Sequence, residues 1–346
     1  MLIFNLNTII CLITIIIINY VLSKNNFLID KPELSHHKFK HKKIIALSGG
    51  LYFFISFFVI SIIQGIDNKI LIYLFPLLFI GIIADIRKSF SPNLRLVFQI
   101  LFFISLVYFL RIKISSIDLE LFDFYLKNNL FNIFFVVFCT VTVLNGHNFM
   151  DGLNGFVTGK FLLILVSIYY IISTSGINFE DEFTTNVKIL FIIILIFFSF
   201  NILGLCFSGD NGIYIFSTFI SLTVINFIEF SNNQISPIIG ATFLWYPAFE
   251  NLFSIIRRLK KKENISNPDN LHLHTLLNTY LKKKFKNKLN STQLNSLSGL
   301  LINIFLIPNF FLSVIWFNNS FNLMLLVITQ IIIYMFAYVR LLKFNL

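Results

Sequence analysis

Long uninterrupted apolar runs dominate the chain, and polar residues gather in the short stretches between them. The run LFIIILIFFSF at 190–200 is apolar on every side, whereas a strand of a membrane barrel alternates polar and apolar residues over about ten positions. A helix needs roughly 20 mostly apolar residues to cross a bilayer. The pattern therefore predicts an all-α, polytopic integral membrane protein.

About eleven runs are long enough to be membrane-spanning helices, and we expect the whole chain, 1–346, to form one transmembrane domain. The expected spans are 1–22, 44–64, 70–83, 95–111, 129–144, 156–174, 187–206, 213–229, 237–256, 297–316 and 320–340. The first run lacks a basic start and a small-residue cleavage pattern, so we expect a retained helix rather than a signal peptide. The main loops are then 23–43 and 257–296.

Composition agrees with this prediction, because 57% of the residues are hydrophobic and only 12% are charged. Soluble proteins average about 25% charged residues. The three cysteines all lie in apolar runs. We therefore interpret them as small buried hydrophobic residues rather than as disulfide or metal ligands.

The basic residues fix an expected orientation, since Lys and Arg concentrate in the cytoplasmic loops of membrane proteins. With eleven spans and the N-terminus outside, 22 of the 27 Lys and Arg residues fall on the inner side and 5 on the outer side. The C-terminus is then inside. The acidic stretch FEDEF at 179–183 falls outside.

The same topology places four polar clusters on the cytoplasmic face, although no acidic residue was used to derive it. These clusters are ADIRKSFSPNLR (84–95), NGHNFMDGLNG (145–155), SGDNG (208–212) and the loop that carries HLH (272–274). Such convergence is what an active site that faces the cytoplasm would produce.

Each cluster has a structural and a chemical interpretation. Asn148, Asp151 and Asn154 are spaced by three and six residues, so they share one side of a helical turn and could coordinate a hard cation or contact the edge of a base. Asn, Asp and Gly are also good turn formers. Asp85 and Asp210 stand at helix boundaries, where an interfacial charge or a simple turn is the alternative.

His272 and His274 form an isolated His-x-His pair in a basic loop, and no further ligand lies at the spacing of a structural zinc site. Glu250 is an ionisable residue inside an expected membrane helix. Such residues are costly and usually functional, although a salt bridge to another helix would also explain it.

Three Asp residues from separate helices, two His and many basic residues together predict a site for a divalent metal and phosphates. Mg²⁺ takes a few carboxylates and leaves its other positions to water and phosphate oxygens. Phosphoryl transfer needs that metal together with cationic groups that bind the phosphate charge. Because the site lies at the bilayer surface, we expect one lipid phosphate and one soluble phosphate compound as substrates.

In their order along the chain, these motifs resemble those of the polyprenyl-phosphate N-acetylhexosamine-1-phosphate transferases, which also include the phospho-MurNAc-pentapeptide translocases. The resemblance runs from DKPELSHHKF (30–39) through SGG (48–50) and the four clusters to ISPIIGATFLWYPAFENLFSIIRR and PDNLHLHTLL. It implies transfer of a sugar 1-phosphate from a UDP-sugar to a polyprenyl phosphate, with Mg²⁺ (or Mn²⁺) as cofactor and release of UMP. The DNLHLH form resembles the branch that initiates surface polysaccharides.

The resemblance also implies roles for individual residues. Asp210 would be a catalytic, metal-binding aspartate, with Asn148 helping to hold the metal, and Asp85 would activate the lipid phosphate. Asn154 and Asp151 would contact the uracil and nucleotide. His272, His274 and Arg257 would hold the diphosphate and sugar.

One position departs from the family pattern, because the residue before Asp85 is Ala84 where the family has a second aspartate. Asp85 would then act alone or with help from Glu250. An impaired relative therefore remains an alternative to an active transferase. A membrane transporter is a second alternative, and a pentapeptide-sugar translocase is a third that the HLHT form disfavours.

The partners implied are a UDP-N-acetylhexosamine, the polyprenyl phosphate lipid and the bilayer, with no nucleic acid. The expected location is a bacterial cytoplasmic membrane. A homodimer is left open.

Overall fold

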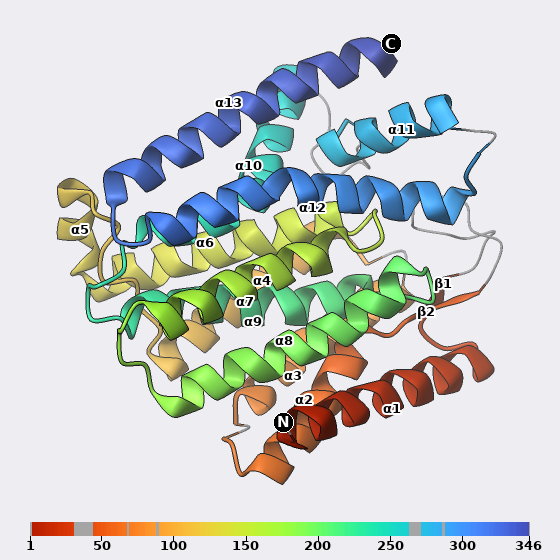
Figure 1. Cartoon of the computed structure of the whole chain (residues 1–346), viewed down its shortest axis with the longest axis horizontal. Coiled ribbons are helices and arrows are strands. Elements are labelled where there is room, and N and C mark those ends of the chain that lie inside the picture. Colours follow the sequence, from red (N-terminus) through yellow and green to blue (C-terminus); the bar gives the residue numbers. More distant parts are fainter. Residues whose placement is uncertain are drawn as a thin grey trace.

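The computed structural model describes residues 2–30, 44–67, 69–87, 90–262, 271–285 and 288–345. Within these ranges the chain forms thirteen α-helices and three short β-strands (Figure 1). The helices are α1 (Leu2–Lys24), α2 (Gly49–Gln64), α3 (Lys69–Ile86), α4 (Pro92–Leu110), α5 (Glu120–Leu126), α6 (Asn129–Met150), α7 (Phe156–Thr174), α8 (Asp181–Ile202), α9 (Gly209–Glu229), α10 (Ile238–Lys260), α11 (Leu273–Phe285), α12 (Ser291–Ile315) and α13 (Ser320–Asn345). The strands are β1 (Ile29–Asp30), β2 (Ile45–Leu47) and β3 (Cys206–Phe207).

The predicted all-α, multi-pass membrane architecture is confirmed. A helix covers most of each of the eleven expected spans, and nine helices in the described part of the chain are long and apolar enough to cross a membrane. The remaining two spans are α2, which has only 16 residues, and α10. Helix α10 buries polar residues, among them Glu250 and Asn251, which lowers its apolar character.

The expected loops contain structure that the hydrophobic pattern did not predict. Helix α11 lies inside the loop 257–296, and α5 lies between α4 and α6. Strand β2 pairs antiparallel with β1 and parallel with β3, so Cys206 and the first residues of the run 44–64 are extended rather than helical. A short apolar run is compatible with either a strand or a helix. Most of the first loop, 31–43, lies outside the described residues.

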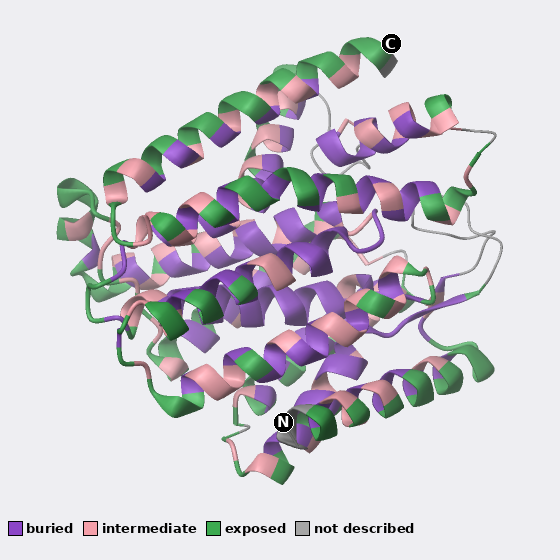
Figure 2. Cartoon of the chain, in the orientation of Figure 1, coloured by how far each residue is buried: buried purple, intermediate pink, exposed green. Residues whose placement is uncertain are grey.

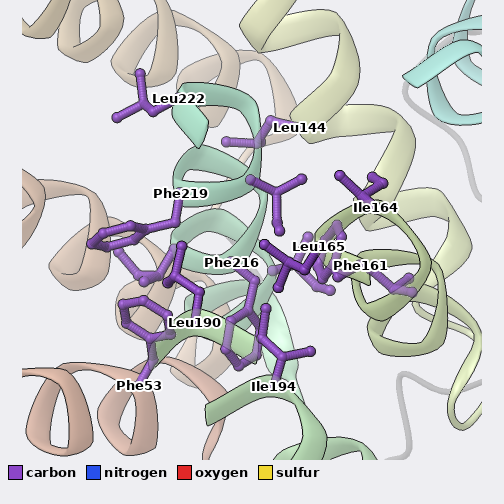
Figure 3. Close-up of a cluster of buried hydrophobic side chains, with 14 of the residues drawn as sticks. Phe53, Leu144, Phe161, Ile164, Leu165, Leu190, Ile194, Phe216, Phe219 and Leu222 are labelled. Atoms are coloured by element: carbon purple, nitrogen blue, oxygen red, sulfur yellow. The ribbon is translucent and has the colours of Figure 1, made fainter. Parts of the chain in front are cut away.

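Helix α9 is the central element of the bundle, because 89% of its most apolar window is buried, against 22% for α4 and for α13. Phe216 and Phe219 of α9 pack against Phe53 of α2, with ring centroids 5.5 and 4.5 Å apart (Figure 3). Figure 2 shows buried residues in the middle of the bundle and exposed residues along the outer helices. The exposed Leu, Ile and Phe side chains there are suited to contact with lipid.

Local signals fix the helix ends that meet at the site. Helix α4 begins at Pro92 after Ser91, whose side chain accepts a hydrogen bond from the Leu94 N–H, and Pro is favoured at this first position. Gly155 has a φ of +71° and begins α7, a backbone conformation that costs glycine little.

The two ends of the bundle are held by different polar contacts. At one end, Ser115 donates its backbone N–H and hydroxyl hydrogen bonds to Glu229, the last residue of α9. At the other end, the end of α3 and the start of α4 meet the start of α9 and the end of α6. The predicted convergence of the clusters 84–95, 145–155 and 208–212 is therefore confirmed.

Candidate active site

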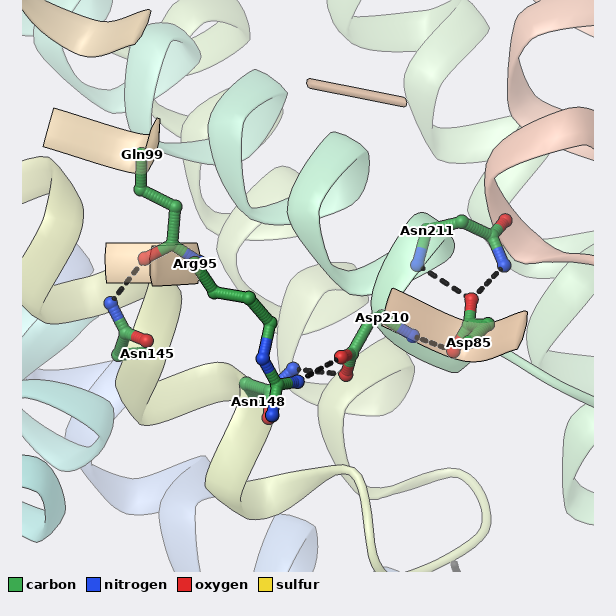
Figure 4. Close-up of polar contacts among 7 residues, drawn as sticks. All are labelled: Asp85, Arg95, Gln99, Asn145, Asn148, Asp210 and Asn211. Atoms are coloured by element: carbon green, nitrogen blue, oxygen red, sulfur yellow. Dashed lines mark hydrogen bonds and ion pairs between the residues drawn. The ribbon is translucent and has the colours of Figure 1, made fainter. Parts of the chain in front are cut away.

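The carboxylate of Asp210 is the centre of the polar cluster at this end of the bundle. Its Oδ2 atom lies 2.6 Å from a guanidinium nitrogen of Arg95, and its Oδ1 atom accepts a hydrogen bond of 2.7 Å from the Asn148 amide (Figure 4). The Arg95 and Asp210 side chains remain 27% and 20% exposed. The cluster can therefore be reached from outside, although three separate helices build it.

Asp85 approaches the same point from α3 and holds the beginning of α9. Its Oδ1 accepts the Asp210 N–H at 2.8 Å, while its Oδ2 accepts the Asn211 N–H at 3.0 Å and the Asn211 amide group at 2.6 Å. The first N–H groups of a helix have no partner within the helix and carry partial positive charge. Asp85 thus acts as a cap supplied by another helix, and it fixes the backbone that carries Asp210.

Asn211 is fully buried and joins this helix end to the strands. Its Oδ1 accepts the Gly50 N–H at 2.7 Å, and its amide group also donates to the Leu47 carbonyl oxygen. A Cβ atom on Gly50 would lie 2.6 Å from the Asn211 oxygen. The glycines of SGG at 48–50 are therefore needed for close approach between α2 and α9.

Arg95, Asn211 and Gln99 also belong to this polar cluster, and the sequence did not indicate them as site residues. The Gln99 side-chain oxygen accepts a hydrogen bond of 2.9 Å from Asn145 and ties α4 to α6 (Figure 4). Arg95 and Asn211 both lie inside clusters that the sequence singled out. Their roles depend on partners more than 100 residues away, 115 for Arg95 and 161 for Asn211, which spacing does not reveal.

The turn 151–155 is held rigidly by carboxamide side chains from other helices. Asn295 of α12 accepts the Asn154 N–H at 2.6 Å and donates to the Gly152 carbonyl oxygen. Asn201 of α8 accepts the Gly155 N–H at 2.7 Å, and Asn303 donates to the Gly155 carbonyl oxygen at 2.8 Å. These bonds satisfy the buried backbone of the turn and fix its position at the end of α6.

The two predicted nucleotide-contacting residues differ in their surroundings. Asn154 is buried, and its amide group lies 3.4 Å from the Ser296 hydroxyl. Asp151 stands beside the Asp210 and Asp85 carboxylates. Desolvation raises the pKa of Asp151 well above the ordinary value for an aspartate, and the negative charges of these two carboxylates raise it further.

The two predicted histidines pack against the aromatic residues on either side of this turn. The His272 ring stacks on Phe149 of α6 at 5.4 Å and on His274 at 5.3 Å, while His274 lies 5.7 Å from the Phe156 ring. The HLH segment therefore packs against the segment 145–156, at both ends of the turn 151–155.

Glu250 explains how His272 is oriented. This carboxylate is fully buried; its Oε1 lies 2.8 Å from His272 Nδ1, and its Oε2 accepts a hydrogen bond of 2.7 Å from the Tyr334 hydroxyl. Glu250 therefore fixes the orientation of the His272 ring. Glu250 thus forms the interhelical polar link that the sequence offered as one of its two interpretations.

Arg257 is predicted to bind the diphosphate. In the structure its guanidinium binds the backbone directly before the HLH segment. One guanidinium nitrogen donates to the Leu271 carbonyl oxygen at 3.0 Å and lies 3.3 Å from the Tyr338 hydroxyl. The guanidinium also lies over the Phe253 ring. Its predicted diphosphate contact is not tested by these bonds.

The donors in the cluster fit a magnesium ion with few protein ligands. The Asp210 carboxylate lies between the Arg95 guanidinium and the Asn148 carboxamide, and the Asp85 carboxylate binds the backbone N–H of Asp210. Carboxylate and carboxamide oxygens are the hard ligands that Mg²⁺ prefers, and the ion retains positions for water and phosphate. In the described part of the chain, no group of three or more His, Cys, Asp and Glu side chains is arranged so that it could hold a metal ion by itself, so an ion here would need the carboxamide, water and phosphate as further ligands.

Carboxylates and cations gathered at helix ends, at one face of a membrane bundle, define a class of membrane-embedded sites for phosphorylated substrates. Residues 68–228 match the model of glycosyl transferase family 4. That segment contains Asp85, Asn148, Asp151, Asn154 and Asp210.

Three curated proteins show the same relationship over most of the chain. The probable undecaprenyl-phosphate N-acetylglucosaminyl 1-phosphate transferase of Bacillus subtilis is 25% identical over 77% of this chain and 75% of its own. The undecaprenyl-phosphate alpha-N-acetylglucosaminyl 1-phosphate transferases of Escherichia coli K12 and Thermotoga maritima are 27% and 22% identical, over 72% and 76% of this chain and 69% and 77% of their own. The comparisons thus support the similarity of this chain to the polyprenyl-phosphate N-acetylhexosamine-1-phosphate transferases that its motifs indicated.

Proposed function

We propose that the protein transfers a sugar 1-phosphate, specifically an N-acetylhexosamine 1-phosphate, from a UDP-sugar to undecaprenyl or another polyprenyl phosphate. UMP is the second product, and the lipid-linked sugar starts a cell-surface glycan. The reaction takes place at the cytoplasmic face of a bacterial inner membrane. The family and the names of the relatives support the transfer to a polyprenyl phosphate, and the remainder is our proposal.

The observation that carries this proposal is the placement of Asp210. Its carboxylate stands at the N-terminal end of α9 between the Arg95 guanidinium and the Asn148 amide, at the end of the bundle where a lipid head group would lie. Helix N-termini and guanidinium groups both favour phosphate. The site therefore offers positive and metal-binding groups together at one end of the bundle.

The chemical step is a displacement at the sugar-bearing phosphorus of the UDP-sugar. An oxygen of the acceptor phosphate forms the new bond to this phosphorus, and the bond from the phosphorus to the bridging oxygen breaks. UMP leaves with that electron pair, so the product is a sugar diphosphate on the polyprenol. A phosphate monoester has its second pKa near about 6, so the acceptor is already ionised at neutral pH and needs little help from a general base.

The residues of the chain have separate tasks in this proposal. Asp210 and Asn148 would hold Mg²⁺, which supplies charge neutralisation for phosphate oxygens. Asp85 keeps Asp210 in place through the start of α9. His272, oriented by Glu250, and His274 would contact the diphosphate, and Asn154 and Asp151 would contact the nucleotide.

Two alternatives make different use of the same residues. A transporter is expected to place its polar residues near the middle of the membrane on broken helices, whereas Asp85, Asn148 and Asp210 stand at helix ends. An impaired relative is suggested by Ala84, which is buried. The bonds of Asp85 to the start of α9 give that residue a structural task that needs no second aspartate.

The test uses the purified protein in detergent with undecaprenyl phosphate, Mg²⁺ and a panel of UDP-sugars, and follows UMP release. We expect lipid-dependent UMP release that is lost in EDTA and in Asp210→Asn. Asp67→Asn is the matched control, because Asp67 is exposed and remote in sequence from these clusters. A folded protein that gives no lipid-dependent UMP with any sugar would contradict the proposal, and Ala84→Asp would then test whether activity can be restored.

A further inference from the structure

The buried side of α13 changes from leucine to tyrosine along the helix. Only 22% of the most apolar window of α13 is buried, and the helix packs against α10 and α11 (Figure 1). Its buried residues recur at helical spacings of three and four; they are Leu323, Leu326, Gln330, Tyr334 and Tyr338. Helix α13 lies outside the segment 68–228 that matches the family model. Two of its tyrosines nevertheless contact the residues that hold the HLH segment.

Tyr334 is connected to His272 through one carboxylate. The Tyr334 hydroxyl donates a hydrogen bond of 2.7 Å to Oε2 of Glu250, and Oε1 of the same carboxylate lies 2.8 Å from His272 Nδ1. All three side chains are buried. Removal of a donor from a buried charged group is costly, so the hydroxyl restricts the carboxylate to one orientation. Tyr334 therefore fixes the group that in turn fixes the His272 ring.

Tyr338 reaches the same segment by a second route, through Arg257. The guanidinium lies over the Tyr338 ring, 5.8 Å from its centroid, and one guanidinium nitrogen lies 3.3 Å from the Tyr338 hydroxyl. The same nitrogen donates to the Leu271 carbonyl oxygen at 3.0 Å. Because Leu271 directly precedes His272, this route holds the backbone of the segment, whereas the first route holds a side chain.

The hydroxyl groups explain why tyrosine occupies both positions. Phenylalanine would fill nearly the same space, and a buried tyrosine hydroxyl usually requires a hydrogen-bond partner. The two rings are stacked, with centroids 6.2 Å apart and planes inclined by 8°, so α13 carries both hydroxyls as one pair. We propose that Tyr334 and Tyr338 are positioning residues that hold the HLH segment in the geometry that receives the diphosphate of the UDP-sugar. This inference rests on the proposed function.

The experiment compares tyrosine variants with a packing control on the same helix, in full-length protein in phosphatidylcholine nanodiscs. Tyr334→Phe and Tyr338→Phe each remove a hydroxyl and keep the ring. Leu323→Ala is the control, because Leu323 is fully buried on α13 but lies about 16 Å along the helix axis from Tyr334. Hydrogen exchange with mass spectrometry measures the opening of the segment 271–276, and UMP release gives kcat and the two KM values.

Tyr334→Phe should raise the KM for the UDP-sugar about tenfold and leave the KM for the lipid acceptor unchanged. Loss of the hydrogen-bonded support of a metal-binding histidine typically costs about 10–100-fold, and we expect the lower end for His272. Tyr338→Phe should raise the same KM about threefold, since it keeps the ring beneath the guanidinium. Both variants should speed amide exchange in 271–276, whereas Leu323→Ala should lower thermal stability and change neither KM.

A double variant tests whether Tyr334 acts through Glu250. Residues in one hydrogen-bonded chain have non-additive effects. Tyr334→Phe combined with Glu250→Gln should therefore raise the KM for the UDP-sugar no further than Glu250→Gln alone. Additive effects would show that the hydroxyl acts by another route, which would contradict the inference.

Three other results would overturn it: an unchanged UDP-sugar KM in Tyr334→Phe, the same change of KM in Leu323→Ala, or unchanged exchange of 271–276 in both tyrosine variants. Failure of the proposed function gives a different result, because hydrogen exchange needs no turnover. A wild-type protein that releases no UMP, but whose segment 271–276 is protected by the two hydroxyls, would contradict the function alone.

Discussion

Replacement of Asp85 by asparagine should destabilise the end of α9, whatever part Asp85 plays in the chemistry. Its carboxylate accepts three hydrogen bonds, from the N–H groups of Asp210 and Asn211 at 2.8 and 3.0 Å and from the Asn211 amide at 2.6 Å. Asparagine offers one acceptor oxygen, and its NH₂ group would face a donor.

The expected cost follows from these contacts. A hydrogen bond to a charged group contributes about 1.5–3 kcal/mol, and a negative charge at a helix N-terminus contributes about 0.3–2 kcal/mol. Because the contributions overlap and Asn retains one acceptor, we expect a loss of about 2–4 kcal/mol in the free energy of unfolding. Metal binding should weaken as well, since the same bonds position Asp210.

The assay is unfolding by SDS in mixed micelles, followed by circular dichroism, with Asp67→Asn as the matched control. Asp67 caps the start of α3 through the Lys69 N–H and is exposed, and Asn is an equally good cap, so the control should change stability by less than about 0.5 kcal/mol. If Asp85→Asn is as stable as the control, the interpretation of Asp85 as a helix cap is wrong. Loss of activity at unchanged stability would instead support a role in the chemical step.

Two further variants test the supports of the site. Tyr334→Phe removes the hydroxyl donor 2.7 Å from the buried Glu250 and should lower the free energy of unfolding by about 1.5–3 kcal/mol. Tyr169→Phe, at an exposed tyrosine, is the control. Equal stability of the two variants would contradict the prediction. Gly146→Ala would place a Cβ atom 2.0 Å from the Pro247 carbonyl oxygen, so α6 and α10 must separate. We expect a loss of about 1–3 kcal/mol and reduced UMP release, and wild-type values for both would show that the helices separate without cost.

The convergence of the polar clusters could be predicted from the sequence because it depends on local properties. Apolar runs mark the helices, and the distribution of Lys and Arg assigns their ends to two faces. Asp85, Asn148 and Asp210 were thereby placed on one face, and the structure brings them into one hydrogen-bonded cluster. The structure inside the expected loops was not predicted, as α11 in the loop 257–296 illustrates.

The sequence by itself determined the membrane class and the family motifs, and it grouped the polar clusters at one end of the helices, because hydrophobicity and charge act residue by residue. Only the tertiary structure decided which groups form hydrogen bonds and ion pairs with one another. These pairs are Arg95 with Asp210, Asp85 with the start of α9, and Glu250 with His272 and Tyr334. These partners come from different helices, and their contacts depend on how the helices are rotated and packed. The tasks of capping α9 and orienting His272 follow from that packing and from no single motif.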